Sequence, residues 1–358
     1  MTARAVGLPD RHPVSGLPAR VTIWEVGARD GLQNEPVVLP VEAKVEFLDR
    51  LATAGLQVLE ATSFAHPRWV PQLADADALV SMGFTRPMAE AGPRLRLVQV
   101  PGAGLDRIDR GAMRPGMRLA NAYGHEVGIA EYIMGAMLAM TRSYGSLDAS
   151  LRKGRWDSQW AIGTPMPPPS PELAGKTLGI LGFGHIGEAL ARRATAFDMQ
   201  VCAVRRQAQK DVPAGVSFIG GPERLDDVLH QSDYLAVTLS LSPETQGLLD
   251  ARRLGLMKPT AYLINVARAE IIDEVALYRA LASGRLAGAA LDVWYRYPTT
   301  PEPTLPATQP FHELANVILT PHVSGWTEGM LEARAKLIAG NIERTARGER
   351  PLNEIGPR

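Results

Sequence analysis

The stretch KTLGILGFGHIG, residues 176–187, joins an apolar run to the start of a helical pattern. Its glycines have the G-x-G-x-x-G spacing of a dinucleotide-binding loop. The first glycine permits a tight turn, the second lets the backbone approach a pyrophosphate, and the third lets helix and strand pack closely. The helix N-terminus also favours negative charge. A tight turn without a ligand is the alternative. The residues expected to bind the cofactor here are Gly182, Gly184, His185, Ile186 and Gly187.

Around this loop, apolar strand-like runs alternate with stretches of helical periodicity. Parallel strands need crossover connections, so this alternation predicts helices packed on a parallel sheet. The fold class is therefore α/β, with a doubly wound parallel-sheet Rossmann domain over about residues 123–324. The expected strands are KTLGILGFG (176–184), QVCAV (200–204), SDYLAVTL (232–239), TAYLINVA (260–267), AGAALDVW (287–294) and NVILTPH (316–322).

The preceding half alternates in the same way and predicts a second, smaller α/β unit. The family resemblance described below implies that this unit is flavodoxin-like and binds substrate. It is expected to be discontinuous, with residues 21–122 joined by 325–358 after a flexible tail of residues 1–20. A final helix over about 327–347 would fold back onto it. A single long helix is expected over 131–156, before a proline-rich stretch.

Composition excludes several classes of function. The 358 residues include 38 Lys and Arg against 38 Asp and Glu, so no basic nucleic-acid footprint exists. The longest apolar stretch, Tyr132 to Met140, is far shorter than the ~20 residues that cross a bilayer, so no membrane partner is expected. The one cysteine, Cys202, excludes a disulfide framework or thiolate metal cluster and fits a reducing cytoplasm.

Five separated motifs resemble the D-isomer-specific 2-hydroxyacid dehydrogenase family over about residues 74–345. They are LVQVPGAGLDRID (97–109), ELAGKTLGILGFGHIG (172–187), NVARAEIIDEVAL (265–277), GAALDVW (288–294) and NVILTPHVSGW (316–326). The resemblance implies an NAD(P)-dependent oxidoreductase that interconverts a small D-2-hydroxy acid and its 2-oxo acid by hydride transfer. It also implies a homodimer formed through the large domain and the long linker helix.

The same resemblance assigns roles to individual residues. Arg268 would hold the substrate carboxylate and the reacting oxygen, and His322 would be the general acid/base. Substrate would also meet Met82, Gly83, Gly102, Ala103 and Gly104. Further cofactor-binding residues would be Leu239, Val266 and Asp292, the last placed near the nicotinamide ring.

These roles are chemically reasonable on their own. A guanidinium fixes a carboxylate through two parallel hydrogen bonds, and a histidine with a reference pKa of about 6.5 moves protons near neutrality. The alternatives are a salt-bridging surface arginine at Arg268 and a plain turn histidine at His322.

One position departs from the family pattern. The family usually has a glutamate before the proline that follows its LDV motif, where it pairs with the histidine and raises its pKa, and here Tyr297 precedes Pro298. A tyrosine hydroxyl orients an imidazole but carries no charge at neutral pH. Either His322 works with a lower pKa, or the chemistry differs, as in the related formate dehydrogenases that lack this glutamate. Glu302 could substitute only through a loop shift. We expect the histidine limb of the pH-rate profile for reduction at or below the unperturbed value.

Cofactor choice depends on the end of the second strand. Where an acidic residue would bind the ribose hydroxyls of NAD, the chain has Arg205 and Arg206. Arginine suits a 2′-phosphate, so NADP is favoured over NAD. Solvated surface arginines beside an NAD site are the alternative.

Residues 21–75 resemble the start of hydroxymethylglutaryl-CoA lyase, a metal-dependent β/α barrel. That resemblance would make Arg29 catalytic, Asp30 a metal ligand and Glu60 an active-site acid. The lyase's His-x-His pair, later asparagine and cysteine loop have no counterpart, and roughly 55 residues cannot build a barrel of about 250. No metal site is expected. We expect this piece to replace the dehydrogenase's first βαβ unit; a poorly packed fusion remnant is the alternative.

Three classes of function therefore remain in order of preference. The first is the dehydrogenase, which depends on Arg268 and His322. The second is a non-catalytic NAD(H)-binding regulatory protein on the same fold, which the missing glutamate keeps open. The third, a metal-dependent acyl-CoA lyase, lacks its ligand set.

Overall fold

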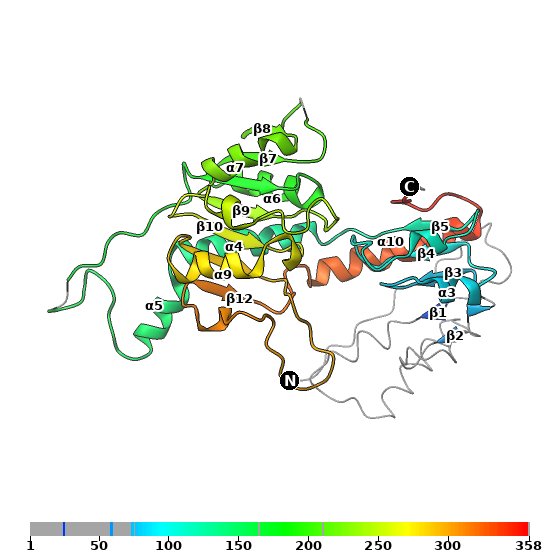
Figure 1. The fold of residues 1–358 in the computed structure, drawn as a ribbon, viewed down its shortest axis with the longest axis horizontal. Helices are drawn as coiled ribbons and strands as arrows, with labels where there is room; N and C mark the ends of the chain where they lie inside the picture. The colour runs from blue at the N-terminus through cyan, green and yellow to red at the C-terminus, as the bar shows by residue number, and fades with distance from the viewer. Residues whose placement is uncertain are drawn as a thin grey trace. The chain divides into compact units, whose positions relative to one another are not determined.

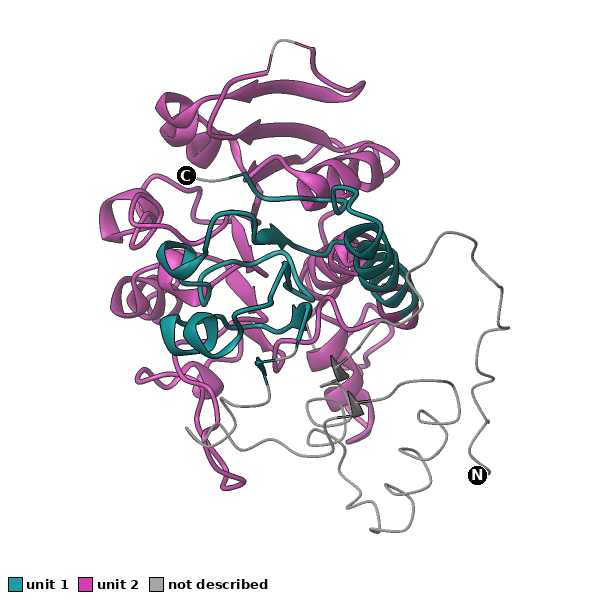
Figure 2. Cartoon of the chain, turned by 90° about the vertical axis from the view of Figure 1, so that its right-hand side faces the viewer, with its two compact units in different colours: residues 1–123, 332–358 teal, residues 124–331 magenta. Residues whose placement is uncertain are grey.

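The computed structural model describes residues 24–25, 58–59, 73–74, 76–163, 165–209 and 211–356. The chain divides into two compact units (Figure 2). The larger unit comprises residues 124–331, and the smaller one comprises residues 1–123 with 332–358. We describe each unit by itself.

The larger unit is built on a seven-stranded parallel sheet (Figure 1). Its order is β12-β11-β10-β9-β6-β7-β8, so the chain starts in the middle, winds to one edge and then returns to wind to the other. This order creates a topological switch point between β6 and β9. The strands are β6 Thr177–Leu181, β7 Gln200–Val204, β8 Val216–Gly220, β9 Tyr234–Val237, β10 Tyr262–Asn265, β11 Gly288–Leu291 and β12 Val317–Leu319.

Helices cover both faces of this sheet, and alternating side chains of each strand feed two separate cores. On β9, Leu235 and Val237 join the core under α7, α8 and α9, whereas Tyr234 and Ala236 join the core under α4 and α6. The helices are α4 Glu126–Thr141, α5 Tyr144–Leu151, α6 His185–Thr195, α7 Leu225–Gln231, α8 Ala251–Leu254 and α9 Glu274–Ala282. Short 3₁₀ turns are η4 Pro222–Arg224, η5 Ala269–Ile271 and η6 Phe311–Glu313.

The smaller unit contains a three-stranded parallel sheet of order β3-β4-β5. Its elements are β3 Ala78–Val80, α3 Arg86–Ala91, β4 Leu97–Gln99, η3 Arg110–Ala112 and β5 Arg118–Ala120. Phe84, Leu95 and Val98 lie in its core. A separate parallel pair is formed by β1 Trp24–Glu25 and β2 Val58–Leu59.

The C-terminal helix α10, Glu328–Ala346, is close to its predicted bounds, and the chain after residue 331 belongs to the smaller unit. Its buried Asn341 donates to Gln99 Oε1 at 2.7 Å and accepts from the Leu352 amide at 2.6 Å. Arg96 donates to the carbonyl of Thr345. Buried polar groups need such partners, so this network fixes how the returning chain docks.

The α/β fold class is confirmed, and two details of the prediction are wrong. The helix expected over 131–156 is two helices, because α4 ends at Thr141 and Ser143 adopts a left-handed φ of 52° that no α-helix continues through. Two strands, β5 and β8, were not predicted. Across the part of the chain that the structure describes, no helix is long and apolar enough to cross a membrane.

Candidate active site

The predicted dinucleotide loop follows β6, at the carboxyl edge of the sheet beside the switch point. Gly182 has a φ of 105°, and an added Cβ would lie 2.8 Å from the Leu239 amide nitrogen. A Cβ on Gly187 would lie 2.8 Å from the Gly182 carbonyl oxygen. Both positions therefore need glycine for the turn and for close packing.

Gly184 differs from these two glycines. It precedes the first residue of α6, and a Cβ added there would meet nothing within 4 Å. The protein itself does not require a glycine at this position, whereas a pyrophosphate that approaches the helix N-terminus does. The loop therefore fits a dinucleotide cofactor. His185 is exposed at the start of α6 and Ile186 packs against the core on that side of the sheet.

Thr238, which the sequence did not single out, fastens this loop. Its hydroxyl lies 2.7 Å from the Gly182 carbonyl oxygen and 3.1 Å from that of Leu181. The next residue, Leu239, is half-buried against the loop. Val266, the first residue after the neighbouring strand β10, is buried. The predicted cofactor residues Leu239 and Val266 thus lie at the carboxyl edge of the same sheet.

The two arginines after β7 differ in their surroundings. Arg205 is half-buried, and its guanidinium donates to Gln209 Oε1 at 2.6 Å. Arg206 is exposed. Both follow the strand that neighbours β6, which is where the adenosine ribose is bound in folds of this topology.

Arg268 caps the turn η5 after β10 and is half-buried. The backbone of this turn is held by Asn265, which is 1% exposed. Asn265 Nδ2 donates to the Arg268 carbonyl at 3.0 Å, and its Oδ1 accepts from the Ala267 amide at 3.1 Å. Asn265 thus holds the backbone at Arg268, a role that no local sequence pattern predicted.

Tyr297 contacts His322, as its position in the sequence suggested. The Tyr297 hydroxyl lies 2.8 Å from His322 Nδ1 and accepts from the Trp294 amide at 3.3 Å. The hydroxyl can donate its proton to a bare Nδ1, or its oxygen can accept from Nδ1–H through a second lone pair. When the oxygen accepts, the neutral ring carries its proton on Nδ1 and Nε2 is free to take a proton.

The surroundings of His322 disfavour its charged form. Burial is the largest cause that lowers its pKa below the usual value, the field of Arg268 lowers it further, and Asp292 opposes both. Burial likewise raises the pKa of Tyr297, so the phenol stays neutral. Arg268, Tyr297, His322 and Asp292 therefore lie close enough to interact.

Asp292 is fully buried directly after β11 and accepts three hydrogen bonds from the segment around His322. Its Oδ1 accepts from Thr320 Oγ1 at 2.6 Å and from the Val323 amide at 2.9 Å, and its Oδ2 accepts from the Ser324 amide at 2.8 Å. His322 itself has a left-handed φ of 59°. A non-glycine residue keeps this conformation only where its surroundings enforce it.

In the smaller unit, the two predicted substrate loops lie together at the carboxyl ends of β3 and β4. Met82 is exposed, and its Cε lies 3.6 Å from where a Cβ on Gly102 would be. Gly83, next in the chain, donates its amide to Ser81 Oγ at 3.2 Å. Ala103 and Gly104 are half-buried in the second loop.

Asn121 supports the second loop and was not predicted. It is 3% exposed, and its Nδ2 donates to the Ala103 carbonyl at 3.0 Å. Its Oδ1 is buried with no hydrogen-bond partner. A buried acceptor without a donor is costly, so a ligand or water that donates to it is favoured at this loop.

Comparison with known proteins identifies the family. The model of the D-isomer specific 2-hydroxyacid dehydrogenase NAD binding domain matches residues 134–324. A glyoxylate reductase of Thermofilum pendens is 35% identical over 282 residues, which cover 77% of this chain and 80% of that protein. The chain belongs to the D-isomer specific 2-hydroxyacid dehydrogenase family. This dehydrogenase family consists of oxidoreductases, which confirms the enzyme class expected from the motifs.

Two further relatives of this dehydrogenase differ in their chemistry. A D-3-phosphoglycerate dehydrogenase of Methanocaldococcus jannaschii is 32% identical over 327 residues, covering 87% of this chain but only 59% of that enzyme. An acyclic imino acid reductase, Bsp5, solved with NADPH and D-Arg, superposes with a TM-score of 0.73 at 25% identity. The match covers 94% of this chain and all of that one.

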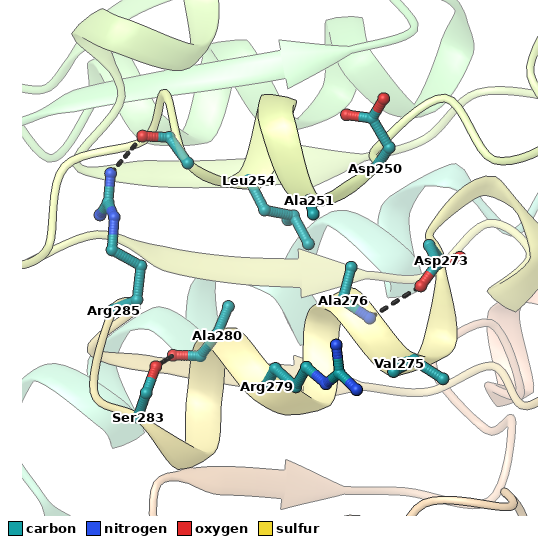
Figure 3. A pocket seen from close by; sticks show the side chains of 11 residues that line it. Asp250, Ala251, Leu254, Asp273, Val275, Ala276, Arg279, Ala280, Ser283 and Arg285 are labelled. Carbon is teal, nitrogen blue, oxygen red and sulfur yellow. Dashed lines mark hydrogen bonds between the residues drawn. The ribbon is translucent and has the colours of Figure 1, made fainter.

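A pocket outside this site lies between α8 and α9 and has a volume of about 470 Å³ (Figure 3). None of the predicted catalytic or cofactor residues lines it. Within the described ranges, no group of three or more His, Cys, Asp and Glu side chains is arranged to hold a metal ion. The lyase-like residues Arg29, Asp30 and Glu60 lie outside the described residues.

Proposed function

We propose that this enzyme reduces a small 2-oxo acid to the D-2-hydroxy acid, and catalyses the reverse reaction, with His322 as the general acid/base. The observation that carries the proposal is the Tyr297–His322 hydrogen bond beside Arg268, in the same unit as the dinucleotide loop. A bound nicotinamide cofactor supplies or accepts the hydride. The remaining chemistry is proton transfer and carboxylate binding, for which these side chains are suited.

Protonated His322 gives its Nε2 proton to the substrate oxygen during reduction and keeps its other proton on Nδ1. The neutral ring, with Nε2 bare, takes a proton there during oxidation. Tyr297 holds the ring through Nδ1 so that Nε2 is the nitrogen that reacts. The hydroxyl also serves the charged ring, because it accepts from Nδ1–H as readily as it donates to Nδ1. Tyr297 thus orients the histidine without adding charge.

Arg268 is the proposed partner of the substrate carboxylate, since a guanidinium supplies both orientation and charge. Met82, Gly83, Gly102, Ala103 and Gly104 are proposed to contact the same small anionic substrate. The smaller unit is the proposed substrate-binding domain and the larger unit the dinucleotide-binding domain. We propose a cytoplasmic enzyme, in keeping with the buried free thiol of Cys202.

The proposed cofactor is NADP or NAD, with NADP slightly favoured. Arg205 and Arg206 support NADP because they follow β7, and a planar guanidinium binds a 2′-phosphate through two hydrogen bonds. The residues proposed to bind the cofactor are Gly182, Gly184, His185, Ile186, Gly187, Arg205, Arg206, Leu239, Val266 and Asp292.

A homodimer is also proposed, and an exposed apolar arm supports it. The arm is the segment of residues 144–163 and 165–166. Its exposed large apolar side chains are Tyr144, Leu147, Leu151, Trp156, Trp160, Ile162 and Met166. Such a cluster in one segment is unfavourable in water and typical of a surface that another protein covers.

A second candidate is reduction of the imine of a 2-oxo acid. Burial lowers the His322 pKa and Tyr297 is neutral, so little imidazolium exists at neutral pH. A protonated imine needs hydride but no proton from His322. The imino acid reductase Bsp5 shares this fold.

The test is a panel of 2-oxo acids supplied with NADH or NADPH, followed by loss of nicotinamide absorbance, with and without methylamine. Turnover without the amine that is lost in His322→Gln supports the dehydrogenase. Turnover only with the amine supports imine reduction. Tight dinucleotide binding with no turnover would reject both in favour of a regulatory protein.

A further inference from the structure

The carboxylate of Asp292 clamps the reactive segment from both sides of His322. Thr320 donates its hydroxyl proton to Asp292 Oδ1 from before the histidine, and the Val323 and Ser324 amides donate from after it. Since an ionised carboxylate only accepts, all three bonds have a fixed direction. These three bonds hold the backbone around His322, which keeps a left-handed conformation.

The clamp continues into helix α4. The Tyr132 hydroxyl lies 2.7 Å from Thr320 Oγ1. Thr320 has a single hydroxyl proton, which goes to Asp292, so Tyr132 must be the donor. The order of donation is therefore Tyr132 to Thr320 to Asp292, which ends at the carboxylate that holds the histidine segment.

An independent set of contacts shows that α4 supports the whole segment. A Cβ on Gly128 would lie 2.7 Å from Thr327 Cγ2, and a Cβ on Gly325 would lie 3.4 Å from Ile129 Cδ1 and from His125 Cβ. His125, Gly128, Ile129 and Tyr132 recur at the three- and four-residue spacing of one helix face. That face lies against residues 320–327.

We propose that Tyr132 and Thr320 are positioning residues for His322, acting through Asp292. The inference rests on the proposed role of His322 as acid/base. Neither residue needs to touch substrate or cofactor. The predicted consequence is that deleting the Tyr132 hydroxyl, at the back of the site, loosens the backbone after His322 and slows proton transfer.

A matched control exists on the same helix. The Tyr234 hydroxyl lies 2.6 Å from Thr141 Oγ1, so a second tyrosine–threonine pair joins α4 to the sheet. Tyr234 begins β9, at the amino edge of the sheet, whereas His322 follows β12 at the carboxyl edge. Tyr234→Phe removes the same kind of bond from the opposite edge.

The first readout needs no turnover. Amide hydrogen exchange is measured at Val323 and Ser324 in the full-length wild type, Tyr132→Phe, Thr320→Val, Thr320→Ser and Tyr234→Phe. Loss of one neutral hydrogen bond should speed exchange about fivefold in Tyr132→Phe. Thr320→Val should have at least this effect, and Thr320→Ser should restore protection. Unchanged exchange in both Tyr132→Phe and Thr320→Val would overturn the clamp.

The second readout is kinetic, with glyoxylate as the 2-oxo acid. Tyr132→Phe should lower kcat about fivefold with an unchanged KM for the dinucleotide, and Tyr234→Phe should change neither. The double variant Tyr132→Phe/Thr320→Val should be no slower than Thr320→Val alone, because both act through one chain of bonds. Faster exchange with an unchanged kcat would overturn positioning. If His322→Gln leaves kcat unchanged, the proposed function fails instead.

Discussion

At His322, the proposed acid/base, a neutral hydroxyl lies where a carboxylate would stabilise the charged ring. The Tyr297 hydroxyl lies 2.8 Å from Nδ1, and burial lowers the pKa of His322 below its usual value. Reduction needs the protonated ring, whereas oxidation needs the neutral ring. With His322 as the proposed acid/base, little of the protonated ring is therefore expected to be available for reduction at neutral pH.

The pH dependence follows from the sign of this shift. Since the His322 pKa is lowered, the protonated fraction falls as pH rises through a value below about 6.5. The reduction rate should therefore decline in that window, and the oxidation rate should rise through it. Profiles of kcat/KM in both directions check this, and a reduction limb well above neutrality would contradict it.

A carboxylate at position 297 should reverse the shift. Tyr297→Glu places an opposite charge beside the imidazolium, so the His322 pKa and the reduction limb should move upward by about one to two pH units. Tyr297→Phe, which removes the hydroxyl without adding charge, should not move the limb upward. Matched pH-rate profiles of the three proteins make the comparison.

The middle glycine of the dinucleotide loop gives a second residue-scale prediction. Gly184→Ala adds a methyl group that meets no protein atom within 4 Å, so the melting temperature should stay unchanged. The methyl group would occupy the space of an approaching pyrophosphate, so NADH and NADPH should bind at least tenfold more weakly. Fluorescence titration measures this. Gly145→Ala, also in open space but within α5, is the control and should leave dinucleotide binding unchanged, with a melting temperature equal to or slightly above that of the wild type.

At the scale of elements, the break between α4 and α5 is set by one residue. Ser143 has a left-handed φ of 52° and makes no side-chain capping bond, although it precedes α5. A left-handed residue costs about 1–2 kcal/mol for most side chains and little for glycine. The junction therefore depends on backbone conformation rather than on the serine hydroxyl.

This account predicts how the junction responds to substitution. Ser143→Val should lower the free energy of unfolding by about 1 kcal/mol, because β-branched residues tolerate this region worst. Ser143→Gly should be neutral or stabilising. Urea denaturation of the three proteins measures the difference, and equal loss in both variants would instead indicate that the hydroxyl matters.

The strands show how much of the fold could be predicted from the sequence. The buried strands β6, β9 and β10 are continuous apolar runs with clear edges, so periodicity found them. By contrast, β5 has only three residues, and the apolar run of β8 is interrupted by the exposed Ser217 and ends at Gly220. The supporting roles of Thr238, Asn265 and Asn121 could not be predicted for another reason. Their bonds join residues brought together by the fold, and no local pattern encodes those partners.

Across the whole molecule the net charge is neutral, so the proposed recognition of an anionic substrate would depend on local groups such as Arg268. The proposed association with a second copy would likewise depend on apolar area. Within the larger unit, the arm of residues 144–163 and 165–166 carries Trp160, whose exposed fraction is 75%, and Ile162, whose exposed fraction is 99%. Covering such side chains stabilises a complex by about 1.5–3 kcal/mol each.

The dimer prediction is tested on this arm. Trp160→Ser/Ile162→Ser should convert a dimer into a monomer in light scattering, while the fold measured by circular dichroism stays intact. Leu352→Ser, an exposed apolar residue of the smaller unit, is the control and should leave the mass unchanged. A wild-type monomer at micromolar concentration would contradict the proposal.

Cys202 is the single cysteine of the chain, and it lies fully buried in β7. Burial raises the pKa of its thiol to about 12, so almost no thiolate forms under physiological conditions. The native enzyme should thus be silent toward maleimide dyes. A cysteine introduced at the exposed Glu90 in one unit and another at Arg192 in the other would accept a fluorophore pair without background labelling. The natural sequence therefore needs no cysteine removed before a fluorophore pair is attached at chosen positions.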